Sequence, residues 1–486
     1  MTADDGELIP HPACFQELYR PREAFQNPPR PRLSPVESDN SSTDSPRLRK
    51  TLGISDGIAI LIGITIGAGI YSTPHLIASN QSSGLTMMGL WLVAGLFVTM
   101  GGLIYAELGT RLPRTGGEYV YISRAFGPMA GFVFGWAQLF IIRTSPAAGL
   151  AIIIVDYLQH FVWLAPLSRT IVCVAIILLV GLLNYAGIRR ASWFQIVTTI
   201  IKVGGLFGLV VASVVFAQGT DWAPDRVPVP SDKSPLALFA VSMMLVVFSY
   251  LGWDRVGYSA GEMKNPRRTI PVSIFVGIGV VIAVYLLANL FYLDVLGLEG
   301  IRGNKRVASE AATVLFGPSG ASLVAILVMI SAAGSINGTM MTAPRVYYAM
   351  AHDRLFFRWF DFVHPRFGTP SRAIMAHCLW AIVILLVRQN FEDIVAGMVF
   401  AVLIFYVVTT LALFRLRRQA VGGPEVFRVP TLIPWIYLAG LVVLIGLRAV
   451  YQWQNSLIDL GFVATGIPFA FVFRNRAVPR GYLDGS

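Results

Sequence analysis

Long apolar segments separated by short polar ones recur along almost the whole chain after residue 50. A helix of about 20 apolar residues is long enough to cross the hydrocarbon core of a bilayer. The pattern predicts about twelve such helices, and therefore an all-α polytopic membrane protein. Their expected ranges are 52–79, 86–107, 129–158, 168–187, 191–217, 236–259, 271–296, 320–350, 373–388, 392–415, 432–450 and 456–474.

Three segments depart from this pattern. Residues 1–50 are polar and rich in proline and lack the apolar core of a signal peptide, which indicates a disordered tail. Residues 108–127 mix proline and glycine with polar and aromatic residues, which favours an interfacial or re-entrant element over a full crossing. The transmembrane domain is expected to cover 51–476, followed by a short terminal segment, 477–486.

The charge distribution predicts the orientation of these helices. Only 13% of the 486 residues are charged, whereas soluble domains average about a quarter, and the net charge is +11. Lysine and arginine concentrate in alternate gaps between the apolar segments, which is the positive-inside pattern. We therefore expect both termini in the cytoplasm and a place in a cell membrane, plasma or inner. The same distribution accounts for the positive charge without a nucleic-acid partner.

Two of the expected spans are interrupted near their middles. The first contains Gly67, Ala68 and Gly69, and the sixth contains the run 248–253, with Gly252 beside a tryptophan. Unpaired backbone is tolerated at membrane depth only where it lines a cavity or is covered by protein. Interrupted spans at matching places in two halves of a chain indicate a transporter's substrate site. Spans one to five and six to ten are accordingly expected to form inverted repeats, with the last two as an appendage.

The first break offers groups for both ends of an amino acid. The N–H groups at Gly67, Ala68 and Gly69 would begin a new half-helix, where unpaired donors and the helix dipole suit a carboxylate. Unpaired carbonyls on the preceding half-helix, which ends near Thr65 and Ile66, could accept from an ammonium. The alternative is that the glycines serve only close helix packing.

The second break supplies the other wall of this predicted site. Phe248 could lie over a bound ligand as a lid, and the backbone at Ser249 and Tyr250 could accept from the amine. Leu251 would intrude into the pocket for the substrate side chain. The alternative is that these residues are ordinary apolar packing.

Four further polar residues lie within apolar spans. Lys202 lies about twelve residues from the nearest cation, Arg190, and an ionisable group at that depth indicates a function, although it could instead snorkel to the interface. Arg143 could face a substrate carboxylate or, in preference, tether backbone carbonyls. Ser335 and Asn337 could either line the pocket or bond neighbouring helices.

The chain offers no recognisable enzymatic or metal site. No Ser/His/Asp grouping, phosphate-binding loop or His/Cys cluster occurs. The three cysteines, Cys14, Cys173 and Cys378, are scattered and form neither a disulfide framework nor a metal-ligand spacing. We expect no catalytic residues, no cofactor and no metal.

An ordered set of short motifs over about 52–430 resembles the L-type amino acid transporters of the amino acid–polyamine–organocation superfamily, and their single-subunit bacterial members in particular. The motifs are residues 57–71, 106–110 with 116–119, 141–145, 252–253 with 261–266, and 334–338 with Arg345. The resemblance implies a LeuT-like fold of twelve helices, five plus five in inverted repeat with helices 1 and 6 broken, that exchanges amino acids by alternating access.

The resemblance also implies roles for particular residues. The stretch 67–69 would bind the substrate carboxylate, and Phe248 would act as the outer gate. Lys202 matches a fifth-helix lysine whose ammonium replaces the ion of sodium-coupled relatives and links the first and eighth helices, so sodium independence is expected. Proton-coupled uptake or efflux and an amino-acid sensor with little transport remain alternatives.

Departures from the family pattern bear on the substrate and the partner. Ala68 replaces a usual serine, and Leu251 stands where carriers of large substrates have a small residue. We therefore expect a small, uncharged pocket for alanine, serine or glycine. Asp254 is followed by Arg255, which would neutralise it, so cationic substrates are disfavoured. Residues 160–169 contain no cysteine, so no disulfide-linked heavy subunit is expected.

Overall fold

The computed structural model describes residues 48–67, 69–216, 228–229, 234–388, 391–451 and 453–474. The chain separates into two compact units, Met1–Ser45 and Pro46–Ser486, and all described residues belong to the second. Most of the predicted tail and the whole of the predicted terminal segment 477–486 lie outside the described residues, and so does Ala68.

Helices account for the regular structure of the described residues, which contain no β-strand beyond one isolated bridge. The elements before residue 230 are α1 (Ile54–Thr65), α2 (Gly69–Ser72), α3 (Pro74–Ala78), α4 (Gly84–Arg111), α5 (Glu118–Phe126), α6 (Pro128–Ala137), η2 (Gln138–Ile142), α7 (Thr144–Leu158), α8 (Pro166–Tyr185) and α9 (Ile188–Phe216). The later elements are α10 (Pro235–Ser249), η3 (Trp253–Glu262), α11 (Pro266–Arg302), α12 (Val307–Phe316), α13 (Pro318–Thr342), α14 (Pro344–His352), η4 (Arg358–Phe360), α15 (Ser371–Arg388), α16 (Phe391–Arg418), α17 (Leu432–Tyr451), α18 (Trp453–Ala464) and α19 (Gly466–Arg474).

Proline marks where several of the long helices begin. Pro128, Pro166, Pro235, Pro266 and Pro318 each occupy the first helical turn. Proline has a fixed φ suited to a helix, and the N–H group that it lacks would have no partner at that position. Local sequence therefore sets the ends of the spans as well as their apolar middles.

Ten helical segments among the described residues are long and apolar enough to cross a membrane. They coincide with ten of the twelve predicted spans. The ninth predicted span corresponds to α15, and the twelfth to the consecutive helices α18 and α19, all of which are shorter or less apolar. The all-α polytopic architecture is thus confirmed, with ten spans identified by length and composition.

Two elements lie between predicted spans. In the segment 108–127, α4 continues to Arg111 and α5 then forms a nine-residue helix, too short to cross a bilayer at about 1.5 Å per residue. The hydrophobic pattern predicts no element over Val307–Phe316, where the structure has α12, because ten residues fall well below the length of a span.

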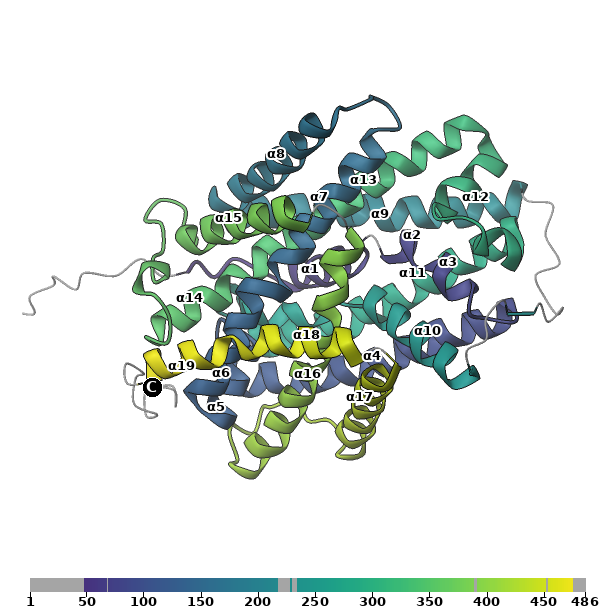
Figure 1. The fold of residues 1–486 in the computed structure, drawn as a ribbon. Coiled ribbons are helices and arrows are strands. Elements are labelled where there is room, and N and C mark those ends of the chain that lie inside the picture. Colours follow the sequence, from purple (N-terminus) through teal and green to yellow (C-terminus); the bar gives the residue numbers. More distant parts are fainter. Residues whose placement is uncertain are drawn as a thin grey trace, which may run out of the picture. The chain divides into compact units, whose positions relative to one another are not determined.

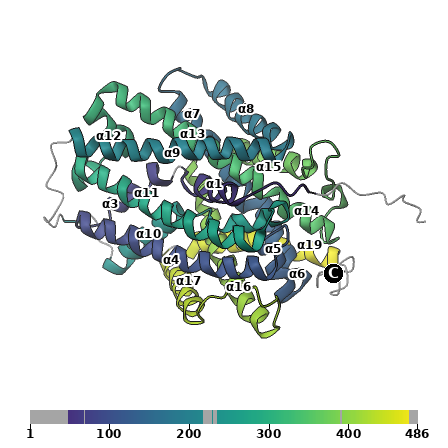
Figure 2. The same ribbon diagram turned by 180° about the vertical axis from the view of Figure 1, so that it is seen from behind.

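Helix α1 lies in the middle of the bundle in both views (Figure 1 and Figure 2). It packs against α9, α11, α13 and η3. Helices α8 and α17 lie at opposite edges and carry many of the exposed large apolar side chains, a surface suited to lipid. The interrupted first span is therefore enclosed by protein, and its unpaired backbone is shielded from lipid.

Candidate functional site

The first and sixth spans both lose helical geometry near their middles. Helix α1 ends at Thr65, Ile66 has a non-helical ψ of 79°, and α2 starts at Gly69. Helix α10 ends at Ser249 and gives way to η3 after Gly252, whose φ is +131°. A side chain at that φ would be strained, which explains the glycine. Both interruptions fall where the sequence predicts them.

The two breaks touch each other. A Cβ atom added to Gly69 would lie 2.9 Å from Ser249 Cα, and one added to Gly252 would lie 3.0 Å from Thr65 N. The backbones meet only because neither glycine has a side chain. Residues at least 180 positions apart thus form one site.

Tyr285 of α11 contacts both breaks. Its buried hydroxyl lies 2.7 Å from Thr65 O and 2.8 Å from Ser249 O, the carbonyls at which α1 and α10 end. Terminal carbonyls of a helix lack intrahelical donors, and a buried one needs another partner. This residue could not be singled out from the sequence, because a tyrosine in an apolar span commonly serves only packing.

Lys202 of α9 lies on the other side of α1 and is fully buried. Its Nζ donates to Gly63 O at 2.9 Å and Ile66 O at 2.8 Å, on the last turn of α1, and to Ser331 O of α13 at 2.9 Å. An ammonium has three donors, and all three are used. The side chain therefore connects the first break to the eighth predicted span and does not snorkel.

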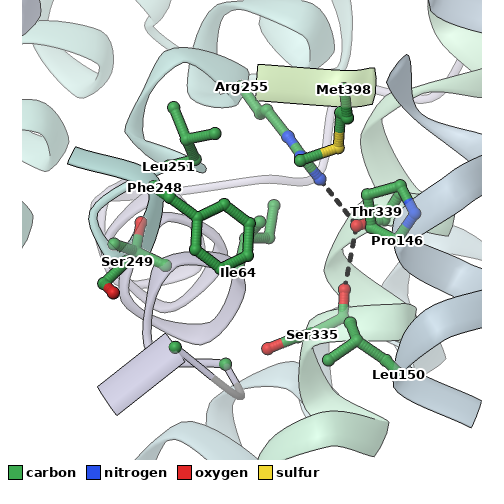
Figure 3. Close-up of a pocket in the computed structure, with 13 residues that line it drawn as sticks. Ile64, Pro146, Leu150, Phe248, Ser249, Leu251, Arg255, Ser335, Thr339 and Met398 are labelled. Carbon is green, nitrogen blue, oxygen red and sulfur yellow. Dashed lines mark hydrogen bonds between the residues drawn. The ribbon is translucent and has the colours of Figure 1, made fainter. Parts of the chain in front are cut away.

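A pocket opens where the breaks meet. Seven of the predicted site residues line it: Thr65, Gly67, Gly69, Phe248, Ser249, Leu251 and Ser335. Six residues that the sequence did not single out as pocket residues complete the lining: Ile64, Pro146, Leu150, Arg255, Thr339 and Met398. Figure 3 shows Phe248 across the middle of the pocket, with Ser249 and Leu251 on one side and Thr339 on the other.

Three described residues of the predicted set lie away from the pocket. Ile66 is buried and contributes its carbonyl to Lys202. Tyr250 donates to Trp91 O at 3.2 Å. Asn337 of α13 donates to Ala191 O at 3.0 Å in α9 and accepts from Asn184 of α8 at 2.9 Å. Asn337 bonds neighbouring helices, whereas Ser335 of the same helix faces the pocket.

A buried ionic network lies beside the pocket. Arg143 donates to Asp254, to the Tyr258 hydroxyl at 2.9 Å and to Gln138 Oε1 at 2.5 Å, and lies 3.6 Å from Glu118 Oε2. The preferred expectation that Arg143 tethers backbone carbonyls is therefore wrong, because its donors go to side chains. Burial, and then the charge of Asp254, raise the pKa of Glu118 to about 7.

The expected pairing of Asp254 with its neighbour Arg255 is also wrong. Asp254 binds Arg143, and Arg255 donates to Thr339 Oγ1 at 2.6 Å and lines the pocket. In a 3₁₀-helix such as η3, consecutive side chains lie about 120° apart, so neighbours face different elements. The expectation of an uncharged pocket is wrong as well, because Arg255 is a cation that lines the pocket.

A metal site is not evident among the described residues, where no three His, Cys, Asp or Glu side chains gather closely enough to hold an ion. The chemistry of the pocket consists instead of helix-end backbone groups, serine and threonine hydroxyls and one guanidinium. Such groups can bind and orient a small polar molecule.

The relatives found by comparison with known proteins are all named as amino acid transporters or exchangers. A family model described as amino acid permease matches residues 52–470. The chain is 28% identical to the serine/threonine exchanger SteT of Bacillus subtilis (strain 168), over 89% of this chain and 99% of that protein. It is 28% identical to the human b(0,+)-type amino acid transporter 1, over 90% of each chain.

A further relative is the mouse large neutral amino acids transporter small subunit 2, 28% identical over 92% of this chain and 85% of that protein. The matches span nearly all of the helical unit, including both breaks. Together with the ten apolar helices, they identify this chain as an integral membrane protein that belongs to the amino acid permease family, and not as an enzyme.

Proposed function

We propose that this chain exchanges small neutral L-amino acids across a cell membrane by alternating access, without sodium. The observation that carries the proposal is the pocket at the contact between the two helix breaks. A zwitterion brings one carboxylate and one ammonium, and helix ends offer donors on one side and acceptors on the other. The name of the serine/threonine exchanger among the relatives supports both small substrates and exchange.

In this mechanism the substrate carboxylate binds N–H groups of the first break, within 67–69, and backbone carbonyls near Phe248 accept from the ammonium. Phe248, which crosses the pocket in Figure 3, acts as the outer gate. Leu251 limits the length of the substrate side chain. Transport follows from movement of the half-helices about their breaks, where few backbone hydrogen bonds resist bending.

Lys202 performs the coupling role in this mechanism. Its ammonium binds two carbonyls of α1 and one of α13, so a positive charge already occupies the backbone acceptors at the break. Sodium binds the same kind of oxygen ligand. A covalently held cation in this position supports exchange that needs no sodium.

We also propose the finer architecture that the family resemblance implies. Twelve spans would form a five-plus-five inverted repeat, in which α1 and α10 begin the two halves, and the matched breaks support this arrangement. Both termini would be cytoplasmic. The loop between α7 and α8 contains no cysteine, which supports function without a disulfide-linked heavy subunit.

The test is a competition panel in proteoliposomes that contain the purified full-length chain. Uptake of labelled alanine against internal alanine is measured in choline buffer, with and without added sodium. We expect serine and glycine to compete, phenylalanine and lysine to compete poorly, and sodium to have no effect. Dependence on sodium, or equal competition by phenylalanine, would contradict the proposed mechanism.

A further inference from the structure

Arg255 places a guanidinium on the wall of the pocket. Its side chain is only 3% exposed and donates to Thr339 Oγ1 at 2.6 Å. Within the described part of the chain, its Nε has no hydrogen-bond partner and no carboxylate lies within 4 Å of its nitrogens. The carboxylate next to it in sequence, Asp254, is bound to Arg143 instead.

A buried cation without a contacting anion is costly, and the cost falls when an anion reaches it. Arginine stays protonated in proteins, so Arg255 cannot escape this cost by losing its proton. Its fork of donors fits a carboxylate with two parallel hydrogen bonds. Thr339 accepts from one of these donors, and the Arg255 side chain lines the pocket.

The guanidinium also lies away from the groups proposed to hold the backbone of the substrate. In Figure 3 its tip lies beside Thr339, on the other side of the Phe248 ring from Ser249. Ser249 is the residue against which Gly69 packs. An α-carboxylate held at the first break would therefore not occupy Arg255, which leaves the guanidinium for a group on the substrate side chain.

Arg255 is also the one ionisable side chain among the described residues that line the pocket. We propose that the pocket accepts L-amino acids whose side chain ends in a carboxylate, with aspartate as the best fit, and that Arg255 is the counter-ion of this carboxylate. The inference rests on the proposed function, in that the pocket must be the substrate site. It widens the substrate class from neutral to acidic amino acids and explains a charge that a neutral substrate does not require.

The test uses full-length chain in proteoliposomes loaded with unlabelled alanine, in sodium-free buffer. Inhibition of labelled alanine uptake by external aspartate, asparagine and serine is measured for the wild type, Arg255→Gln and Arg255→Lys. Arg267→Gln is the matched control, because Arg267 forms an exposed pair with Glu425. Monodispersity after purification is checked for every variant.

We expect aspartate to inhibit the wild type at least as strongly as asparagine. Arg255→Gln should raise the inhibition constant for aspartate about tenfold or more, because one partner of a buried charge pair is lost. The constants for serine and asparagine should change less than the constant for aspartate, Arg255→Lys should retain part of the aspartate inhibition, and Arg267→Gln should behave as the wild type.

Two results would overturn the inference while the proposed function stands. One is alanine exchange by the wild type that aspartate does not inhibit, a measurement that needs no variant. The other is an equal loss of affinity for all ligands in folded Arg255→Gln, which would mean that Arg255 serves the substrate α-carboxylate. Absence of alanine uptake by inserted wild type across the panel would instead contradict the proposed function itself.

Discussion

Replacement of Lys202 by methionine tests the proposed link between α9, the first break and α13. Methionine keeps most of the length and apolar volume of the stem but removes the three donors. Gly63 O and Ile66 O would each keep one hydroxyl partner, Ser335 Oγ at 2.8 Å and Ser331 Oγ at 2.9 Å respectively. The substitution therefore removes the ammonium without leaving either α1 carbonyl unpaired.

The size of the effect follows from these contacts. Each hydrogen bond from a charged donor contributes about 1.5–3 kcal/mol, and two of them reach α1. Removal of a buried ammonium returns several kcal/mol of desolvation cost, which offsets about half of this loss. We expect a net loss of about 1.5–3 kcal/mol in the state that the lysine stabilises, which corresponds to roughly a 10- to 100-fold lower exchange rate.

The assay is alanine exchange in proteoliposomes, together with thermal unfolding in detergent to verify that the variant is folded. The matched control is Thr199→Val, which removes one neutral hydrogen bond, at 3.2 Å, from the same helix to Ala59 O of α1. The control should slow exchange less than Lys202→Met does, by about twofold to at most about tenfold, since a neutral hydrogen bond contributes only about 0.5–1.5 kcal/mol. Exchange by folded Lys202→Met at the wild-type rate would refute the coupling role.

Three other substitutions test separate parts of the site. Leu251→Gly should widen selectivity toward leucine and phenylalanine in the competition panel, and an unchanged profile would show that Leu251 does not limit substrate size. Gly69→Ala should cost about 1–3 kcal/mol through overpacking against Ser249 and slow exchange correspondingly; wild-type exchange would show that the close approach is dispensable. The pKa of Glu118 is raised from 4.5 to about 7. Between these pH values the Glu118 carboxyl is therefore protonated in the folded chain and ionised in the unfolded chain. The free energy of unfolding should therefore fall as pH rises from about 4.5 through 7. In thermal unfolding, Glu118→Gln should reduce this dependence of stability on pH. If the dependence is the same in the variant as in the wild type, groups other than Glu118 cause it.

The spans and breaks could be predicted because their causes are local. Apolar length sets a membrane helix, and glycine at 67, 69 and 252 marks where a helix opens. Lys202 stood out for the same reason, since an ionisable residue deep in an apolar run is costly without a dedicated set of acceptors. The structure supplies such acceptors, at the break that the glycines create.

The partners of other polar residues depend on tertiary packing and could not be predicted. Nothing in the sequence near Tyr285 indicates that its hydroxyl reaches two helix ends that are 36 and 220 positions away. Adjacency in sequence suggested the wrong partner for Asp254, because the turn of η3 directs it to Arg143 and directs Arg255 into the pocket. Contacts between residues far apart in the sequence therefore determine the charge of the pocket and, with it, the selectivity for substrates.

Exchange through this pocket is tested most directly by uptake of labelled alanine into proteoliposomes, with and without internal amino acid, in the absence of sodium and of a pH gradient. The proposed mechanism predicts uptake only into preloaded vesicles, and loss of that uptake in folded Lys202→Met. Uptake into empty vesicles that grows with an imposed proton gradient would contradict exchange in favour of proton coupling. Absence of flux from correctly inserted protein under both conditions would contradict transport and favour an amino-acid sensor.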